Sequence, residues 1–307
     1  MNYFIVFDCG ATKTECALAD INGNILYTTT GGAANYLVTG TSGTARIISS
    51  LLKDCIKKFN ADYSDIENIV IGAAGAGRRE DAEKLKSFLH EIFSADGIKI
   101  KSLTVVGDTQ IALQGAFPNE AGCILIAGTG SIIYGKDEIG NIYRAGGFGR
   151  VLGDEGSGFS IGRKGLQAAA KYFDGSGDET LIVSLIEERY SINSANELIT
   201  KVYKENFDIA SIAEVVIIAA ENEDQIAHHI LLEEAENLIH HISTMMKKMN
   251  TIDLCVSFAG SLISNNNIYS DMLRDKIRTS LPSVKIVAPK YSPIEGAILI
   301  AKEILND

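Results

Sequence analysis

The chain contains one strand-and-turn pattern twice, and this repetition limits the folds that it can adopt. Residues 3–7 (YFIVF) form an apolar run typical of a strand buried on both faces, and a turn follows at residues 9–14 (CGATKT). Residues 123–127 (CILIA) form a second such strand, which leads into the turn at residues 128–131 (GTGS). The first glycines of the two turns are 118 residues apart.

A short sequence after each turn is also repeated. The segment Gly-Asn-Ile begins at Gly23 and again at Gly140, an interval of 117 residues. Two echoes at nearly one interval indicate a duplicated β-hairpin unit, one in each of two domains.

The first turn has the chemistry of an anion site. Gly10 lacks a Cβ, so backbone N–H groups and the hydroxyls of Thr12 and Thr14 can approach a phosphate closely. Asp8 ends the strand beside this turn and is a candidate ligand for Mg²⁺, which proteins bind through one or two carboxylates together with substrate phosphates. A polar hairpin with an aspartate in its turn is the alternative. Two such turns facing one another would hold a polyphosphate, which favours a nucleotide site.

The predicted elements divide the chain into two α/β domains. The N-terminal half follows the order βββαβαβα, with helices expected at residues 44–59, 78–93 and 110–117. Residues 119–122 (NEAG) are interpreted as a hinge. We therefore expect an N-terminal domain of residues 1–118 plus 292–307 and a C-terminal domain of residues 119–291.

Composition excludes several classes of partner. The chain has 307 residues, 46% of them hydrophobic and 22% charged, with a net charge of −11, which argues against nucleic acid and anionic membranes. No apolar run reaches the roughly 18 residues that a transmembrane helix needs. The N-terminus lacks a basic region, so we expect a cytoplasmic protein.

Cysteine and histidine residues give no metal motif. The five cysteines are scattered, and none forms a C-x-x-C pair, so buried thiols are expected. The histidine pairs 228–229 and 240–241 are interpreted as ordinary helix-surface residues.

Common nucleotide-binding motifs are absent, but five short polar or glycine-rich segments are spread along the chain. We call them the five pieces. There is no P-loop, dinucleotide fingerprint or protein-kinase signature. The pieces are the two turns, residues 107–109 (GDT) at a strand end, the glycine-rich segment 146–158, and residues 259–261 (AGS) at a strand-to-helix junction. Ligands of α/β proteins gather at the carboxyl ends of strands, so these pieces are expected around one site.

These pieces resemble the sugar kinase/actin/Hsp70 superfamily, and more closely the N-acetylglucosamine kinase and BadF/BadG/BcrA/BcrD ATPase family. The similarity extends from D-x-G-x-T-x-T at residues 8–14 to residues 292–297 (SPIEGA), and its most specific parts are residues 128–131 and 153–158 (GDEGSG). It implies two actin-like (ribonuclease H-like) ATPase domains with a cleft between them. It also implies an ATP- and Mg²⁺-dependent kinase acting on the 6-hydroxyl of an amino sugar, most simply N-acetylglucosamine, and we expect a homodimer.

The resemblance also implies a role for each matching residue. Asp108 matches the catalytic base, Asp8 lies near Mg²⁺, and Phe148 stands where the family often has tryptophan. The cofactor-binding residues are Gly10, Thr12, Lys13, Thr14, Thr129, Gly260 and Ser261. The sugar-binding residues are Asn35, Ser131, Gly147, Phe148, Gly149 and Asp154. For Asp108 the alternative is a helix N-cap, and for Glu155 it is a structural role in the glycine turn.

Three other functions remain open. One is a kinase for glucosamine or for a muramic-type cell-wall sugar. Another is a BadF-type ATPase activator of a dehydratase or reductase, although Cys123 has no second cysteine within the next hundred residues to share an iron–sulfur cluster. The third is a nucleotide-dependent regulator without turnover.

Overall fold

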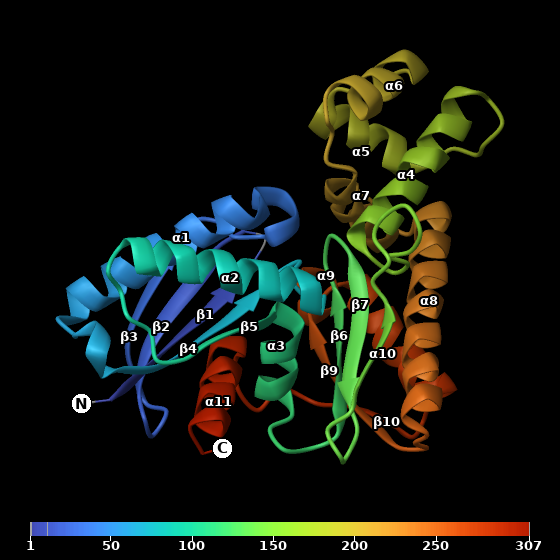
Figure 1. Cartoon of the computed structure of the whole chain (residues 1–307). Coiled ribbons are helices and arrows are strands. Elements are labelled where there is room, and N and C mark those ends of the chain that lie inside the picture. The colour runs from blue at the N-terminus through green and yellow to red at the C-terminus, as the bar shows by residue number, and fades with distance from the viewer. Residues whose placement is uncertain (1, 11, 307) are drawn as a thin grey trace. The chain divides into compact units, whose positions relative to one another are not determined.

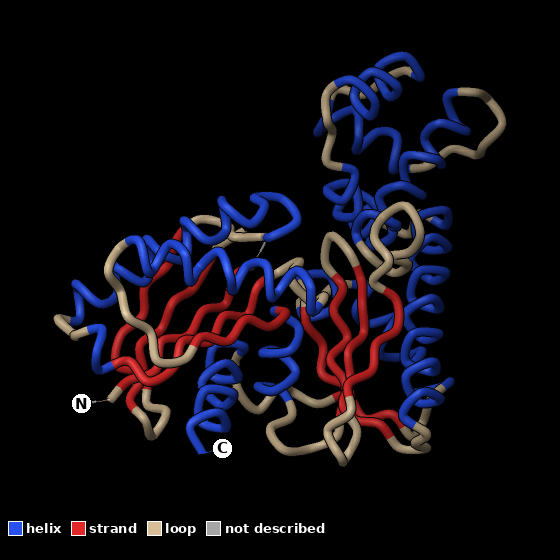
Figure 2. The backbone as a smooth tube through the Cα atoms, viewed as in Figure 1, coloured by secondary structure: helices blue, strands red, loops and turns tan. Residues whose placement is uncertain are grey.

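The computed structural model describes residues 2–10 and 12–306, which form two compact units. Unit 1 comprises Met1–Glu120 and Ala288–Asp307, and unit 2 comprises Ala121–Val287. Within the described residues each unit is built on a five-stranded sheet with helices packed against it, as Figures 1 and 2 show. The expected α/β class is confirmed.

The sheet of unit 1 has the strand order β3-β2-β1-β4-β5. Strands β1, β2 and β3 pair antiparallel, and β1, β4 and β5 pair parallel, as the order βββαβαβα predicts. The elements of unit 1 are β1 (Tyr3–Cys9), β2 (Thr14–Asp20), β3 (Ile25–Gly31), α1 (Tyr36–Phe59), a 3₁₀ helix (Tyr63–Asp65), β4 (Ile66–Ala73), α2 (Arg79–Ala95), β5 (Leu103–Gly107), α3 (Asp108–Ala116) and α11 (Pro293–Asn306).

Strand β1 is buried on both faces because its side chains alternate between two cores. Ile5 and Phe7 belong to one apolar cluster, which includes side chains of α1 and α2. Phe4 and Val6 belong to the other, which includes side chains of α3 and α11. Figure 1 shows α1 and α2 over one face of the sheet and α3 and α11 over the other. The expectation of a strand covered on both sides is confirmed.

Two helices of unit 1 begin earlier than expected. Helix α1 starts at Tyr36 and not at residue 44, with a kink at Gly40, whose φ is 65°. The kink interrupts the apolar periodicity, which explains why only the part after it was recognisable. Helix α3 begins at Asp108, directly after β5, with Gly107 as its N-cap residue.

Helix α11 packs against α3 through glycines. A Cβ on Gly296 would lie 2.0 Å from the carbonyl oxygen of Ile111, and one on Gly115 would lie 2.5 Å from that of Ser292. The helix start is held by a capping box, in which the Ser292 amide and hydroxyl donate to the Glu295 carboxylate at 2.8 and 2.7 Å.

The sheet of unit 2 repeats this arrangement, with the strand order β10-β9-β6-β7-β8. Strands β6, β7 and β8 pair antiparallel, and β6, β9 and β10 pair parallel. The elements of unit 2 are β6 (Gly122–Ala127), β7 (Ser131–Lys136), β8 (Ile142–Gly146), α4 (Gly158–Phe173), α5 (Leu181–Tyr190), α6 (Ala195–Lys204), a 3₁₀ helix (Ile209–Ser211), α7 (Ile212–Glu221), α8 (Gln225–Met249), β9 (Leu254–Ala259), α9 (Ser261–Ser264), α10 (Ile268–Ser280) and β10 (Val284–Ile286).

The duplicated hairpin extends to individual hydrogen bonds. In the β2–β3 turn, Asp20 Oδ1 accepts from the Asn24 amide and Asp20 Oδ2 from Asn24 Nδ2, both at 2.9 Å. In the β7–β8 turn, Asp137 accepts from the amide and Nδ2 of Asn141 in the same way, at 2.8 and 2.9 Å. The duplication predicted from the sequence is confirmed.

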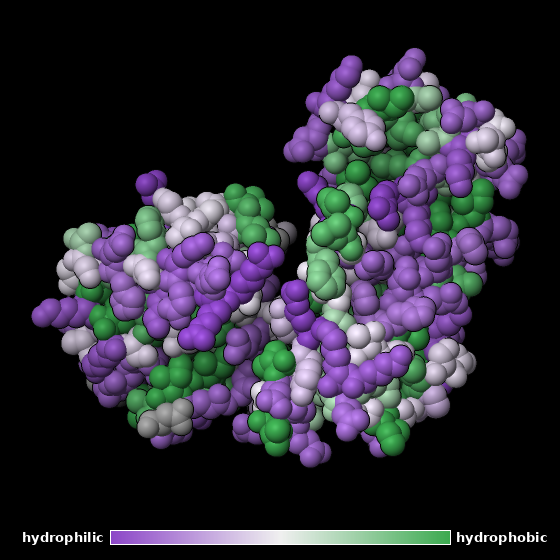
Figure 3. Space-filling view, turned by 45° about the vertical axis from the view of Figure 1, so that its right-hand side comes forward, coloured by the Kyte–Doolittle hydropathy of each residue, from purple (hydrophilic) through white to green (hydrophobic). Residues whose placement is uncertain are grey.

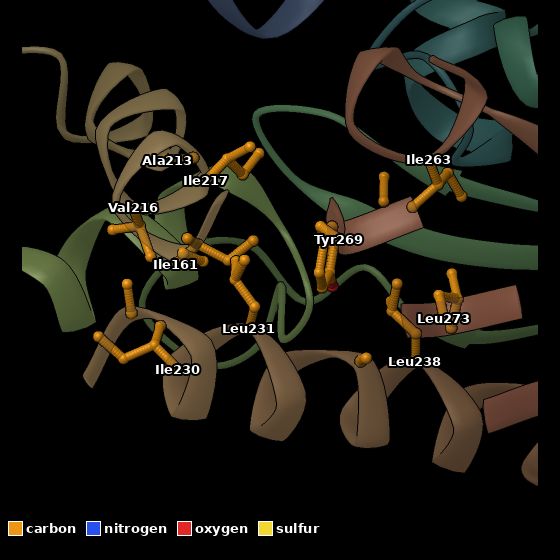
Figure 4. Close-up of a cluster of buried hydrophobic side chains, with 14 of the residues drawn as sticks. Ile161, Ala213, Val216, Ile217, Ile230, Leu231, Leu238, Ile263, Tyr269 and Leu273 are labelled. Carbon is orange, nitrogen blue, oxygen red and sulfur yellow. The ribbon is translucent and has the colours of Figure 1, made fainter. Parts of the chain in front are cut away.

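The core of unit 2 joins the sheet to α4, α7, α8 and α10. Figure 4 shows part of it, where Leu231 and Leu238 of α8 lie among side chains that include Ile161, Val216 and Tyr269. Figure 3 shows hydrophobic residues reaching the surface of the molecule, and the exposed ones on α5 and α6 include Leu181 and Ile199. Within residues 2–10 and 12–306, none of the helices combines the length and apolar character required to cross a bilayer.

Candidate active site

The β1–β2 turn of unit 1 presents polar groups to solvent. The Gly10 amide donates to the Lys13 carbonyl oxygen at 2.9 Å, which closes the turn. Thr12 and Lys13 are exposed, and Lys13 Nζ lies 3.7 Å from a carboxylate oxygen of Glu15. Ala11 lies outside the described residues. Thr12 and Lys13 therefore remain available to a ligand, whereas the Gly10 amide is used within the turn and not on an anion as the sequence had indicated.

Thr14 lies differently from the expectation. It is the first residue of β2 and is fully buried, and its hydroxyl donates to the Gly32 carbonyl oxygen at 2.8 Å. This contact ties the turn to the segment after β3. The hydroxyl of Thr14 is thus used inside the protein and does not face an anion as the sequence had indicated.

Asp8 is a half-buried carboxylate near the end of β1. Burial raises its pKa from 3.8 to about 6, the negative charges of Asp108 and Glu15 add to the rise, and Lys13 opposes it. A carboxylate in this setting gains from a nearby cation, because a positive charge favours its ionised form. No cluster of three or more metal-ligating side chains occurs among the residues described, which is compatible with Mg²⁺ because that ion is usually held by few carboxylates and by phosphates.

Asp108 begins α3 at the end of β5. Its Oδ1 accepts from the Thr109 amide at 2.9 Å, and burial raises its pKa although backbone hydrogen bonds oppose the rise. Because Gly107 occupies the N-cap position, Asp108 is not the N-cap residue that the alternative interpretation required. It combines the position and the raised pKa of a candidate general base.

Asn35 is held beside the β1–β2 turn by its neighbours. The Ala34 amide donates to the Gly10 carbonyl oxygen at 3.3 Å, and the Tyr36 amide donates to Ala74 at 2.8 Å. Asn35 caps α1, with its Oδ1 accepting from the Leu37 amide at 3.0 Å. The sequence-predicted residues of unit 1 therefore gather at one end of its sheet.

The β6–β7 turn of unit 2 is held by the first turn of α4. The Gly158 amide donates to the Gly128 carbonyl oxygen at 2.8 Å, and the Phe159 amide donates to that of Thr129 at 3.2 Å. Thr129 is exposed. The structure therefore fixes the backbone of this turn and leaves the side chain of Thr129 accessible.

The glycine-rich segment after β8 needs glycine for its backbone. Gly147 has a φ of +70°, and a Cβ there would lie 2.2 Å from Ile132 Cδ1. Gly149 has a φ of +82° in open space. Between them the Phe148 ring is 63% exposed, with the Arg144 guanidinium 5.3 Å from its centroid. An exposed ring of this kind is suited to stacking on a sugar face.

Asp154, in the loop before α4, lies beside Ser131, the first residue of β7. Asp154 has a left-handed backbone, with a φ of 61°, and a Cβ on Gly130 would lie 2.9 Å from its Oδ2. Burial raises the pKa of Asp154, while backbone hydrogen bonds from Gly149 and Ser131 act against the rise. Ser131 is buried and its hydroxyl donates to the Glu155 carbonyl oxygen at 2.5 Å, so it supports the loop that carries Asp154.

His241 contradicts its interpretation as a surface residue. Its side chain is only 13% exposed, and its Nε2 lies 3.7 Å from Glu155 Oε2. Burial lowers its pKa, and Glu155 acts in the opposite direction. The signal was present, because His241 is three residues after Leu238 and four before Met245, both buried on α8. The neighbouring His240 is exposed, as expected.

Gly260 joins β9 to α9 beside the end of β6. Its φ is +88°, and a Cβ there would lie 2.3 Å from the Ala127 carbonyl oxygen. Ser261 follows as the exposed first residue of α9. Gly260 therefore lies next to the strand that leads into the β6–β7 turn.

Comparison with known proteins gives a consistent picture. The model of the BadF/BadG/BcrA/BcrD ATPase family matches residues 7–301. The chain is 32% identical to N-acetylmuramic acid/N-acetylglucosamine kinase of Clostridium acetobutylicum, over 98% of this chain and 99% of that protein. It is 28% identical to N-acetyl-D-glucosamine kinase of Dictyostelium discoideum, over 97% of each chain.

The fold is also similar to a solved structure. A Chromobacterium violaceum protein, provisionally named an N-acetylglucosamine kinase, superposes with a TM-score of 0.79 at 23% identity, over 98% of this chain and 99% of that one. The expected sugar kinase type of architecture, with actin-like ATPase domains, is thereby confirmed.

Proposed function

This chain belongs to the BadF/BadG/BcrA/BcrD ATPase family, and on that premise we propose that it transfers the γ-phosphate of ATP to the 6-hydroxyl of an amino sugar. It is an ATP-dependent sugar kinase, because named sugar kinases are 28 and 32% identical to it over nearly its whole length. The identity of the acceptor, the hydroxyl attacked and the residue roles are the proposed part.

N-acetylglucosamine is the acceptor that we propose first. Its support is that both of these relatives carry N-acetylglucosamine in their names. N-acetylmuramic acid is a second candidate, because the Clostridium acetobutylicum relative is named for both sugars.

The single observation that carries the mechanism is the environment of Asp108. A carboxylate at a strand end whose pKa is raised by burial is a better proton acceptor than a solvated one. In the proposal it orients the sugar hydroxyl and takes its proton as the oxygen attacks the γ-phosphorus. General base catalysis of this type contributes about 10²–10⁴ in rate.

Charge stabilisation around the phosphates supplies the rest of the proposed mechanism. Asp8 would hold Mg²⁺, which neutralises charge on the phosphate oxygens when bound. The proposed nucleotide contacts come from Thr12, Lys13, Thr129, Gly260 and Ser261, with Gly10 closing the first turn and Thr14 supporting it from inside.

The proposed sugar contacts are of two kinds. Phe148 offers an exposed ring and Asp154 a carboxylate with raised pKa, both suited to direct contact with a sugar. Ser131, Gly147 and Gly149 shape the backbone around them, and Asn35 adds an amide beside the first turn.

The test is ADP release from the purified protein with ATP, Mg²⁺ and one sugar at a time. The panel holds N-acetylglucosamine, glucosamine, N-acetylmannosamine, N-acetylmuramic acid and glucose. We expect the highest kcat/KM with N-acetylglucosamine and a product phosphorylated at the 6-position by NMR. Steady ADP release without any sugar, unaffected by all five, would contradict the proposal.

Asp108→Asn then tests the base. The substitution keeps the size of the side chain and an oxygen for the Thr109 amide, so the fold should survive. Turnover should fall at least about 100-fold while ATP affinity stays near wild type. Asp275→Asn, at an exposed position on α10, is the control and should leave turnover unchanged. Wild-type turnover in a folded Asp108→Asn variant would exclude Asp108 as the base.

A further inference from the structure

Helix α8 carries a buried carboxylate that the sequence motifs do not include. Glu234 is fully buried and lies between Leu231 and Leu238 on the apolar face of the helix. An ionised carboxylate in such a place is stable only where it is paired and hydrogen-bonded. Its partners therefore indicate what it does.

The groups that pair with Glu234 lie in residues 147–157, which we call the glycine loop, and on α4 directly after it. Its Oε2 accepts from the Gly156 amide. Its Oε1 accepts from the Ser160 hydroxyl at 2.9 Å and lies 2.7 Å from Lys164 Nζ, both on α4. Glu234 thus connects α8 to the loop and to the helix that follows it.

The carbonyl side of Gly156 is held by a second buried side chain. The Tyr269 hydroxyl, on α10, donates to the Gly156 carbonyl oxygen at 2.9 Å, and Tyr269 is fully buried. Figure 4 shows Tyr269 and Leu238 within the core of unit 2. Gly156 has a φ of +80°, and a Cβ there would lie 2.3 Å from Leu238 Cγ. Its position is therefore fixed through both backbone groups and by close packing.

This fixed point is two residues from Asp154, whose left-handed φ of 61° is uncommon for a residue with a side chain. The intervening Glu155 carbonyl oxygen is held by Ser131, and the Ser157 amide donates to the Asp154 carbonyl oxygen at 3.2 Å. A backbone in a sparsely populated region persists where its surroundings over-determine it. Glu234 and Tyr269 fix the backbone that follows Asp154, through their hydrogen bonds to Gly156.

We infer that Glu234 and Tyr269 are positioning residues that hold Asp154 in place for the sugar. They do not contact the substrate and act through Gly156. This inference rests on the proposed function, because it takes Asp154 to be a sugar contact. Loss of the Glu234 carboxylate or of the Tyr269 hydroxyl should therefore weaken sugar binding more than ATP binding.

Glu234→Gln is the first test. Glutamine keeps the volume but retains only one acceptor oxygen, so it cannot accept from the Gly156 amide on one side and from Ser160 and Lys164 on the other at the same time. Hydrogen bonds to charged groups are strong enough that we expect the KM for the sugar to rise about tenfold or more. The KM for ATP should stay within about twofold.

Tyr269→Phe is the second variant, since it keeps the ring in the core and removes only the hydroxyl donor. We again expect the KM for the sugar to rise while the KM for ATP stays near wild type. The rise should be smaller, about threefold to fivefold. Glu233→Gln is the matched control, because Glu233 pairs with the same Lys164 at 2.8 Å but is exposed on the surface of α8. It should leave both KM values unchanged.

The outcomes separate the inference from the proposed function. Equal rises in both KM values, or an unchanged KM for the sugar in folded variants, would overturn the positioning role. If Glu234→Gln fails to fold, Tyr269→Phe decides. If the wild type turns over none of the sugars, the proposed function fails. Amide hydrogen exchange of residues 154–157 then decides whether Glu234 and Tyr269 hold this segment in place. Faster exchange in both variants, compared with Glu233→Gln, supports it, and unchanged exchange refutes it.

Discussion

The charge of Asp108 acts on Asp8 within unit 1: burial is the main cause that raises the pKa of Asp8 to about 6, and the negative charge of Asp108 adds to the rise. The two residues come from strand β1 and from the start of α3 directly after β5, and β4 lies between these two strands. The negative charge of Asp108 adds to burial in destabilising the ionised form of Asp8. The unliganded protein therefore carries a cost that a bound cation would relieve.

Asp8→Asn should make the unliganded protein more stable at neutral pH. The pKa of Asp8 rises from its ordinary value of 3.8 to about 6 in the fold, so the cost of ionising it builds up between these pH values and is complete above about pH 6. A rise of about two pKa units corresponds to up to about 3 kcal/mol. We expect a higher Tm than wild type at pH 8 in EDTA without nucleotide, and no difference below about pH 4. Turnover with Mg²⁺ and ATP should be lost.

Asp20→Asn is the control, because it should change the Tm at pH 8 in the opposite direction. Hydrogen bonds from the side chain and amide of Asn24 lower the pKa of Asp20. Its ionised form therefore stabilises the fold above its unfolded pKa, and this contribution is lost as the pH falls. The variant should have a lower Tm than wild type at pH 8. Equal effects of both substitutions on Tm would contradict the assignment of the Asp8 shift to its environment.

Two threonine substitutions should have opposite consequences. Thr14→Val removes a buried hydroxyl and leaves the Gly32 carbonyl oxygen without that donor, so it should lower stability by about 1–3 kcal/mol. Thr129→Val changes an exposed side chain and should leave the Tm near wild type while raising the KM for ATP. Thermal unfolding and ATP titration measure the two effects. A normal KM for ATP in Thr129→Val would remove Thr129 from the nucleotide site.

Gly260→Ala should be severely destabilising. A Cβ there would lie 2.3 Å from the Ala127 carbonyl oxygen, and the φ of +88° is unfavourable for alanine. Gly128→Ala is the control, because a Cβ at Gly128 meets nothing within 4 Å and its φ is not positive. Urea unfolding should show a loss above about 2 kcal/mol for the first variant and below about 1 kcal/mol for the second. Similar losses would mean that the β9–α9 junction adapts to a side chain.

Apolar patterning and repetition were enough to predict the architecture. The run Tyr3–Phe7 reads as a strand covered on both sides because its alternate residues enter two different cores. The first turn of α1 was not predictable in this way. Its exposed residues Leu37 and Val38 precede the kink at Gly40 and are out of phase with the buried face that follows.

Sequence motifs were enough to propose candidate site residues, but not to foresee contacts between residues far apart in the chain. Asp108 and Asp154 were proposed from their match to motifs of a known family, and the structure gives both a raised pKa. Thr14 was misread because its hydroxyl partner, Gly32, is 18 residues away. Glu234 lies four residues before the buried Leu238 on α8, so a charge on an apolar helix face was the available signal.

The position of α11 in the chain has a consequence for biosynthesis. Its residues Ile294, Ala297 and Ile298 complete the core that includes Phe4 and Val6, yet Ala121–Val287 is translated before them. Unit 2 is in effect an insertion within unit 1, and it can fold on the ribosome while unit 1 still lacks α11. Until α11 emerges, the part of the sheet that α11 covers stays open to chaperones and proteases, while α3 already packs on the same face.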